Sequence, residues 1–282
     1  MVAIDHLYKY YGKFPALIDI NLKVEKGIIF GLVGPNGSGK TTLIRAMVGT
    51  LKPSSGRVNV MGMDPIRHRK AISRRIGYMP QEFALYEDLT VEENVKFFAR
   101  LMGVGDVGRI REVLDFVEIG DRSDSPVYAL SGGLKRRVSF AISILHDPYM
   151  LILDEPTAAL DPYLRKKFWE SFRRLKREGK TIIVSTHLVD EISKCDIVGI
   201  LFRGRLVMVD SPDRIFRYGN IQLEILLKER KVIANLPNRP QEIAAYLRKF
   251  GLGEEVEGIH LGITDPDDIL ISIFKKQEES DG

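Results

Sequence analysis

The glycine-rich stretch from Gly34 to Thr42 constrains the fold of this chain more than any other part of its sequence. It reads Gly-Pro-Asn-Gly-Ser-Gly-Lys-Thr-Thr, follows the apolar run 28–33, and precedes apolar residues at helical spacing over 42–48. A loop between a buried strand and a helix start directs backbone N–H groups and the positive end of the helix dipole at one point. The stretch therefore predicts a site for a nucleoside triphosphate.

Each residue type in this loop suits that ligand. Gly34, Gly37 and Gly39 carry no Cβ, so the chain can turn tightly and approach phosphates closely. Lys40 brings a positive charge to the β- and γ-phosphates, and the Thr41 hydroxyl is placed for Mg²⁺. The residues predicted to hold the nucleotide here are Gly34, Pro35, Asn36, Gly37, Ser38, Gly39, Lys40, Thr41 and Thr42.

A second candidate anion site lies at Ser131-Gly132-Gly133, which begins a helix expected to run to Leu145. Glycines in a first helical turn cost up to ~1 kcal/mol each relative to alanine. In return they expose bare N–H groups at a helix N-terminus, where an anion can bind. The alternative is a flexible helix cap that binds nothing.

Two strands end in polar residues that suit phosphate chemistry. The apolar strand 151–153 runs into Asp154 and Glu155, and the strand 181–186 runs into His187. In a parallel sheet these ends share the crevice beside the phosphate loop. We expect Asp154 to hold Mg²⁺ through water, Glu155 to orient an attacking water, and His187 to contact the γ-phosphate.

Composition narrows the class of protein. The 282 residues are 44% hydrophobic and 28% charged, and no apolar run approaches the ~18–20 residues of a membrane span. The start lacks the pattern of a signal peptide, and the single Cys195 excludes an internal disulfide and a cysteine metal cluster, so a cytosolic protein is expected. The part from Ile221 onward has net charge −4 and the remainder +8. No basic run is interleaved with aromatics, so nucleic acid is not an expected partner.

Other segments leave alternatives open. Strands are expected at 2–4 and 18–24, joined by a turn that carries Tyr8, Tyr10 and Tyr11; these tyrosines could stack on a purine or fill the core. Thr90 and Glu93 form a capping-box pattern for a helix reaching residue 102, and another helix is expected over 109–119. Just before Thr90, Phe83 and Tyr86 suit either a protein contact surface or a loop packed on its own core. The remaining expected strands lie at 57–60, 76–79, 197–201 and 205–209.

Taken together, the phosphate loop, Pro80-Gln81, Leu130-Ser131-Gly132-Gly133, Asp154-Glu155 and His187 occur in the order typical of one family. Over residues 1–215 the chain resembles the nucleotide-binding subunit of ABC transporters. The resemblance implies an α/β fold, a P-loop NTPase of the ABC ATPase type. It would have a RecA-like parallel sheet core, an antiparallel β subdomain and an α-helical signature subdomain at about 82–145.

The resemblance also assigns roles. Tyr11 matches the aromatic residue that stacks on adenine, and Gln81 matches the residue that links the γ-phosphate and Mg²⁺ to a membrane partner. Ser131, Gly132 and Gly133 would complete the ATP site of an opposite subunit. The implied catalytic set is Glu155, His187, Lys40 and Gln81, and the implied Mg²⁺ set is Thr41, Gln81 and Asp154.

The implied function is ATP hydrolysis with Mg²⁺ by two copies packed head to tail. Hydrolysis would power transport, in the export direction, through a separate integral membrane permease on whose cytoplasmic side the chain sits. The runs 80–91 and 134–137 are similar to the ABC-2 type exporter branch. Leu134 replaces a frequent glutamine, and Ala158-Ala159-Leu160-Asp161 lacks a frequent serine.

Two other functions are less well supported. A soluble ABC ATPase acting on ribosomes or DNA would carry two cassettes or a long insertion, and this chain has neither. A non-hydrolysing scaffold has no need for Glu155 and His187.

Residues 216–282 match none of these motifs and are expected to form a small α+β accessory domain. Strands are predicted at 221–225, 232–234 and 258–261, with helices at 241–250 and 267–274. The domain could serve dimerisation or regulation, or it could stabilise the rest of the chain.

Overall fold

A six-stranded sheet in the order β5-β6-β7-β3-β8-β9 forms the centre of the molecule, parallel throughout except for β9. The computed structural model describes residues 1–228, 230–250, 256–263 and 266–281. The strands are β3 (Ile29–Val33), β5 (Ile76–Met79), β6 (Met150–Asp154), β7 (Thr181–Thr186), β8 (Ile197–Phe202) and β9 (Arg205–Asp210). Every residue of β3, β6 and β7 is buried, as expected where both faces of a parallel sheet are covered.

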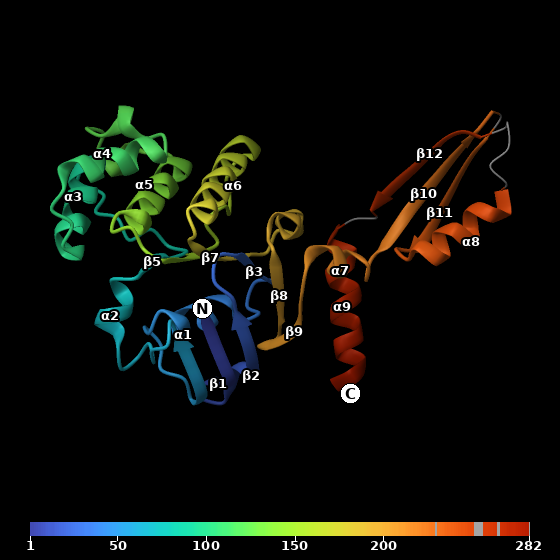
Figure 1. Ribbon diagram of the computed structural model, residues 1–282, viewed down its shortest axis with the longest axis horizontal. Coiled ribbons are helices and arrows are strands. Elements are labelled where there is room, and N and C mark those ends of the chain that lie inside the picture. The colour runs from blue at the N-terminus through green and yellow to red at the C-terminus, as the bar shows by residue number, and fades with distance from the viewer. Residues whose placement is uncertain (229, 251–255, 264–265, 282) are drawn as a thin grey trace.

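The alternation of side chains along β3 divides the core into two layers. Ile29 and Val33 belong to one hydrophobic cluster, with α5 (Gly132–Ile144) and α6 (Pro162–Arg177). Phe30 and Leu32 belong to the other cluster, with α1 (Lys40–Met47) and an antiparallel sheet. Each face of the central sheet therefore has its own covering layer (Figure 1). The phosphate loop connects the C-terminal end of β3, an inner strand, to α1.

The antiparallel sheet has the order β2-β1-β4, built from β1 (Val2–Tyr11), β2 (Phe14–Val24) and β4 (Ser55–Val60). The first two strands are longer than predicted. Tyr8, Tyr10 and Tyr11 lie in β1 itself, and only Gly12 and Lys13 form the turn. The expectation of a turn carrying all three tyrosines is therefore wrong, because the strand pairing continues to the pair Tyr11 and Phe14.

Helices gather on the opposite side of the central sheet (Figure 1). They are α3 (Val91–Met102), α4 (Val107–Phe116) and α5, with the short turns η1 (Gly120–Arg122) and η2 (Val127–Ala129), while α2 (Arg69–Ser73) precedes β5. The predicted capping box is present: the Thr90 side chain accepts from the Glu93 N–H, and the Glu93 carboxylate accepts from the Thr90 N–H. The helix α2 is only five residues long.

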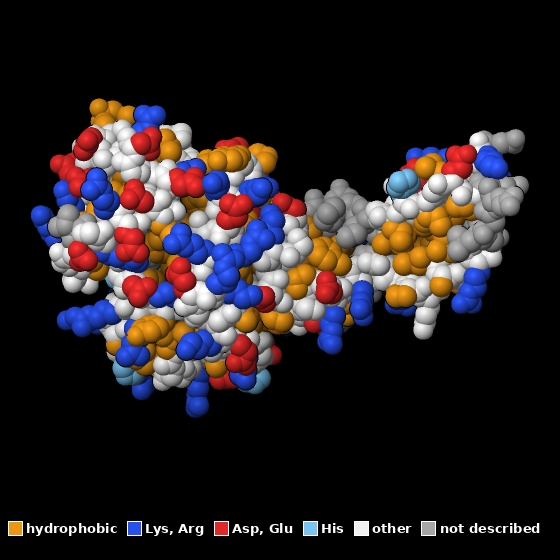
Figure 2. All heavy atoms as spheres, turned by 45° about the horizontal axis from the view of Figure 1, so that its top comes forward, with side chains coloured by type: hydrophobic (Ala, Val, Ile, Leu, Met, Phe, Trp, Pro, Cys, Tyr) orange, Lys and Arg blue, Asp and Glu red, His pale blue; other side chains and the backbone are white. Residues whose placement is uncertain are grey.

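The C-terminal part begins with α7 (Pro212–Phe216) and then extends away from the cassette (Figure 1). We call the extending part the arm: β10 (Asn220–Leu227), β11 (Lys231–Pro237), α8 (Pro240–Phe250) and β12 (Val256–Ile263). Its strands form an antiparallel sheet in the order β11-β10-β12, and hydrophobic side chains gather on the face shown in Figure 2.

The last helix, α9 (Pro266–Asp281), is longer than the predicted 267–274 and returns to the cassette. Its residues Ile269, Leu270 and Ile273 belong to the cluster that includes α5 and α6. The division at residue 215 stays a prediction, and α9 packs across it. Among the described residues, no helix combines the length and the apolar character needed to cross a bilayer.

Candidate functional site

The phosphate loop depends on its glycines for two different reasons. Gly37 and Gly39 have φ angles of +77° and +109°, in the region that side chains disfavour. Gly34 has an ordinary φ, but a Cβ there would lie 2.1 Å from the Leu201 carbonyl oxygen. The loop thus packs directly against the end of β8, and position 34 must be glycine because a side chain would clash there.

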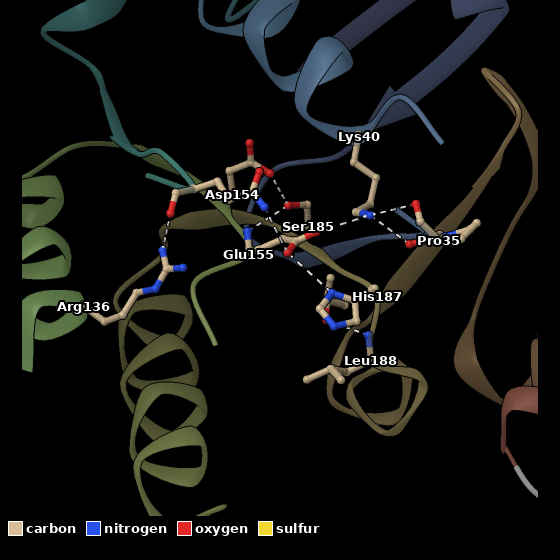
Figure 3. Close-up of polar contacts among 11 residues, drawn as sticks. Pro35, Lys40, Arg136, Asp154, Glu155, Ser185, His187 and Leu188 are labelled. Carbon is tan, nitrogen blue, oxygen red and sulfur yellow. Dashed lines mark hydrogen bonds and ion pairs between the residues drawn. The ribbon is translucent and has the colours of Figure 1, made fainter. Parts of the chain in front are cut away.

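Lys40 points into the centre of the loop (Figure 3). Its Nζ donates to the carbonyl oxygens of Gly34 at 2.8 Å and Pro35 at 3.1 Å. The same Nζ lies 3.4 Å from Glu155 Oε1, and both side chains are buried. A buried ammonium group is stable only with such oxygen partners, so the loop presents one concentrated positive charge.

Glu155 joins several of the predicted site residues. Besides Lys40, its Oε2 accepts from Gln81 Nε2 at 3.5 Å and lies 3.4 Å from His187 Nδ1. Its φ of +49° is unusual for a non-glycine residue, and such strained backbone gathers at functional sites. The other three predicted catalytic residues, Lys40, Gln81 and His187, therefore meet at the Glu155 carboxylate.

Asp154 is fully buried and is held by a residue that the sequence analysis missed. The Ser185 hydroxyl donates to Asp154 Oδ1 at 2.6 Å and accepts from the Glu155 N–H at 2.9 Å (Figure 3). The signal was the position of Ser185 near the end of β7, since the parallel register pairs it with Asp154. Among the described residues, Asp154 Oδ2 has no hydrogen-bond partner.

A hollow of about 370 Å³ lies over the loop. Tyr11, about half exposed, stands at its wall, and so does Phe14, a second aromatic that the sequence analysis missed. Because Tyr10 and Tyr11 are exposed, core filling is wrong for these two tyrosines. The lining residues are Tyr11, Phe14, Ala16, Asn36, Gly37, Gly39, Lys40, Thr41, Thr42, Gln81 and Glu155.

The second glycine-rich site does not line this hollow. Ser131 caps α5 by accepting from the Leu134 N–H at 3.4 Å, and a Cβ on Gly132 would meet no atom within 4 Å. A Cβ on Gly133 would lie 2.7 Å from Leu164 Cδ1, so this glycine also allows α5 to approach α6.

Arg136 of α5 contacts Gln81, the residue just before the predicted helical subdomain. Its guanidinium donates to the Gln81 carbonyl oxygen at 2.8 Å and lies over the Phe83 ring at 5.0 Å. Burial lowers the pKa of Arg136, and the charges of Glu155 and Asp154 partly offset that shift. A movement of Gln81 is therefore coupled to the start of α5.

Comparison with known proteins gives consistent results. The family described as ABC transporter matches residues 17–158. The probable multidrug ABC transporter ATP-binding protein YbhF of Escherichia coli (strain K12) is 37% identical over 219 residues, covering 76% of this chain. The chain spans only 37% of the length of YbhF.

Two further similarities extend this result. The Nod factor export ATP-binding protein I of Rhizobium sp. (strain N33) is 34% identical over 285 residues, covering 96% of this chain and 90% of that protein. A dimeric ATP-binding cassette in a post-hydrolysis state with ADP and Pi matches with a TM-score of 0.70 and 26% identity, covering 75% of this chain and 99% of that one. The predicted fold class, an ABC-type P-loop NTPase, is confirmed.

Proposed function

The chain belongs to the ABC transporter family, and from that premise we propose that it binds and hydrolyses ATP to drive transport through a separate membrane permease. The observation that carries the proposal is the convergence of Lys40, Gln81 and His187 on Glu155. A carboxylate held this way can orient a water molecule and take its proton beside a phosphate loop.

The nucleotide would lie in the hollow over the loop. Its phosphates would meet the N–H groups at the start of α1 and the charge of Lys40. Tyr11 is free to stack on adenine, since its ring is half exposed at the wall of the hollow.

The residues present also fit Mg²⁺. The buried Asp154 Oδ2, without a partner among the described residues, is an oxygen ligand of the kind that the ion takes, and Thr41 and Gln81 line the hollow nearby. Bound Mg²⁺ would neutralise charge on the phosphates. Ser185 holds Asp154 in place, and His187 would stabilise the γ-phosphoryl group as it transfers.

The proposal includes a second copy of the chain, packed head to tail. Ser131, Gly132 and Gly133 begin a helix but do not line the hollow of their own chain. Their exposed N–H groups are free to meet the terminal phosphate held by another copy. ATP would then join two copies, and hydrolysis would release them.

The permease would dock on exposed side chains of α3 and of the loop before it, namely Phe83, Tyr86, Phe97 and Leu101. Tyr86 packs edge-on against Phe97 at 4.8 Å, so this surface is preformed. Arg136 connects it to the site by bonding the Gln81 carbonyl. The name of the Rhizobium relative mentions export, and we propose export of an unidentified substrate, with the chain on the inner face of the membrane.

The variant Glu155→Gln tests the proposal. It keeps the size of the side chain but removes its charge, so phosphate release should fall by about 100-fold or more while ATP binding persists. The variant should also form an ATP-dependent dimer by size-exclusion chromatography, which wild type forms only transiently. Glu178→Gln, at the exposed end of α6, is the matched control and should behave as wild type. Normal hydrolysis by Glu155→Gln would remove Glu155 from this role.

A further inference from the structure

The chain leaves the cassette for the arm and returns at nearly the same place. It leaves through α7 and returns through α9, and both helices contact the short helical turn η3 (Val189–Lys194). This turn begins two residues after His187. The C-terminal extension therefore meets the cassette directly beside a residue that contacts Glu155.

The contact between α9 and the cassette is apolar and buried. Ile269, Leu270 and Ile273 lie in the same buried cluster as Val189 and Ile192 of η3. The next residue, Phe274, stacks on Phe202 of β8, with the ring centroids 4.2 Å apart and the planes at 8°. Packing of this kind fixes position because interior side chains fit without free space.

The turn η3 is also held by α6. Trp169 Nε1 donates to Glu191 Oε1 at 2.9 Å, and the guanidinium of Arg165 lies 3.5 Å from Asp190 Oδ2. Both the cassette core and α9 therefore contact η3. Removing packing on the α9 side takes away one of these contacts, while those with α6, α7 and β3 remain.

The turn is joined to His187 by a short connection. The Leu188 N–H donates to Thr186 Oγ1 at 3.0 Å, and the Glu191 N–H donates to the Leu188 carbonyl at 3.2 Å. The His187 side chain is 37% exposed. His187 is therefore joined to η3 through Leu188, and a displacement of η3 would shift its backbone relative to Glu155.

We propose that α9 is a positioning element for His187, so that the C-terminal extension controls the hydrolytic step. This inference rests on the proposed function, because it assigns His187 to hydrolysis. Ile273 acts through η3, Phe274 anchors the same helix on Phe202 of β8, and neither residue lines the hollow over the loop. A partner that displaces α9 would then change the rate of hydrolysis without changing the phosphate loop.

The test compares two isoleucines of the same helix. Ile273→Ala removes buried packing, whereas Ile271→Ala removes an exposed side chain from the same helix. Steady-state hydrolysis should show kcat reduced by about 5- to 100-fold in Ile273→Ala, because small misplacements of a reacting group are costly. KM and the affinity for ATP should change by less than about twofold. Ile271→Ala should match wild type.

A double variant distinguishes an effect on the position of His187 from a general loss of structure. In a His187→Ala background, Ile273→Ala should lower single-turnover hydrolysis no further, since the residue it positions is gone. Phe274→Leu, which removes the ring stack but keeps an apolar side chain, gives the same comparison if Ile273→Ala does not fold. Wild-type kcat in a folded Ile273→Ala or Phe274→Leu variant would overturn the inference, as would an equal further loss in the His187→Ala background. A wild-type chain that does not hydrolyse ATP would instead overturn the proposed function.

Discussion

At the scale of single residues, one hydroxyl group holds the side chain of Asp154 and the backbone of the adjacent Glu155. Ser185 bonds both Asp154 Oδ1 and the Glu155 N–H, and Asp154 is fully buried. Burying a carboxylate is tolerable only when its oxygens find donors or a cation. Ser185 thus connects the stability of the fold to the geometry of the site.

We predict that Ser185→Ala lowers the free energy of unfolding by about 1–3 kcal/mol, because it leaves a buried charged group without its donor. Urea unfolding followed by circular dichroism, without nucleotide, measures the change. Ser73→Ala is the control, since that exposed hydroxyl bonds only a nearby carbonyl, Lys70 O. An equal effect of both substitutions would contradict the importance of the Asp154 contact.

The sequence predicted the residues of the site that lie in local patterns. The loop residues, Asp154 and Glu155, and His187 each follow or precede a recognisable strand or helix. Ser185 was missed because its bond to Asp154 crosses between strands 31 positions apart, and only the register of β6 with β7 brings the two together. Phe14 was missed for a similar reason, since the hairpin of β1 and β2 carries it to the hollow.

At the scale of elements, α5 lies unusually close to the central sheet. A Cβ on Gly77 of β5 would be 2.0 Å from the Ser143 carbonyl oxygen of α5 and 2.5 Å from Leu151 Cδ2 of β6. The C-terminal part of α5 therefore packs directly against the backbone of β5 at Gly77. The position of Ser131 to Gly133 relative to the rest of the cassette depends on this contact.

We predict that Gly77→Ala destabilises the protein by about 1–3 kcal/mol, since the backbone of α5 must move to admit the methyl group. Thermal or urea unfolding measures this loss. Gly105→Ala is the matched control, because its Cβ would meet no atom within 4 Å and its φ is not positive. If both variants have the same free energy of unfolding, the close packing of α5 on Gly77 does not contribute to stability.

The spacing of apolar residues predicted which segments are helices and which are strands. It did not predict where these elements end or which other elements they pack against. The capping box predicted the start of α3 at residue 91. The strands β1 and β2, in contrast, extend to the turn because they pair with each other across the hairpin, and the pairing includes residues outside the segments of alternating polar and apolar side chains. The segment 267–274 was correctly predicted to be helical. Its sequence did not show, however, that its apolar face would pack against η3, which is far away in the sequence.

At the scale of the whole molecule, the arm and the cassette bury their apolar residues to different extents. The arm is a three-stranded sheet with a single helix, and Ile233, Ile259 and Leu261 remain exposed on it. The strands β3, β6 and β7 are covered on both faces (Figure 1). Since the free energy of local opening follows the amount of buried apolar contact, the two parts should open separately.

We predict that native-state hydrogen exchange shows lower protection for the amides of β10 and β11 than for those of β3, β6 and β7. In low concentrations of denaturant, the arm should exchange by its own opening, while the central strands exchange only with global unfolding. The amides around Ile269 and Ile273 should follow the cassette, because these side chains are buried in its core cluster. If α9 instead opens together with the arm, it cannot hold η3 while the arm moves, and the link from the C-terminal extension to His187 fails at this scale.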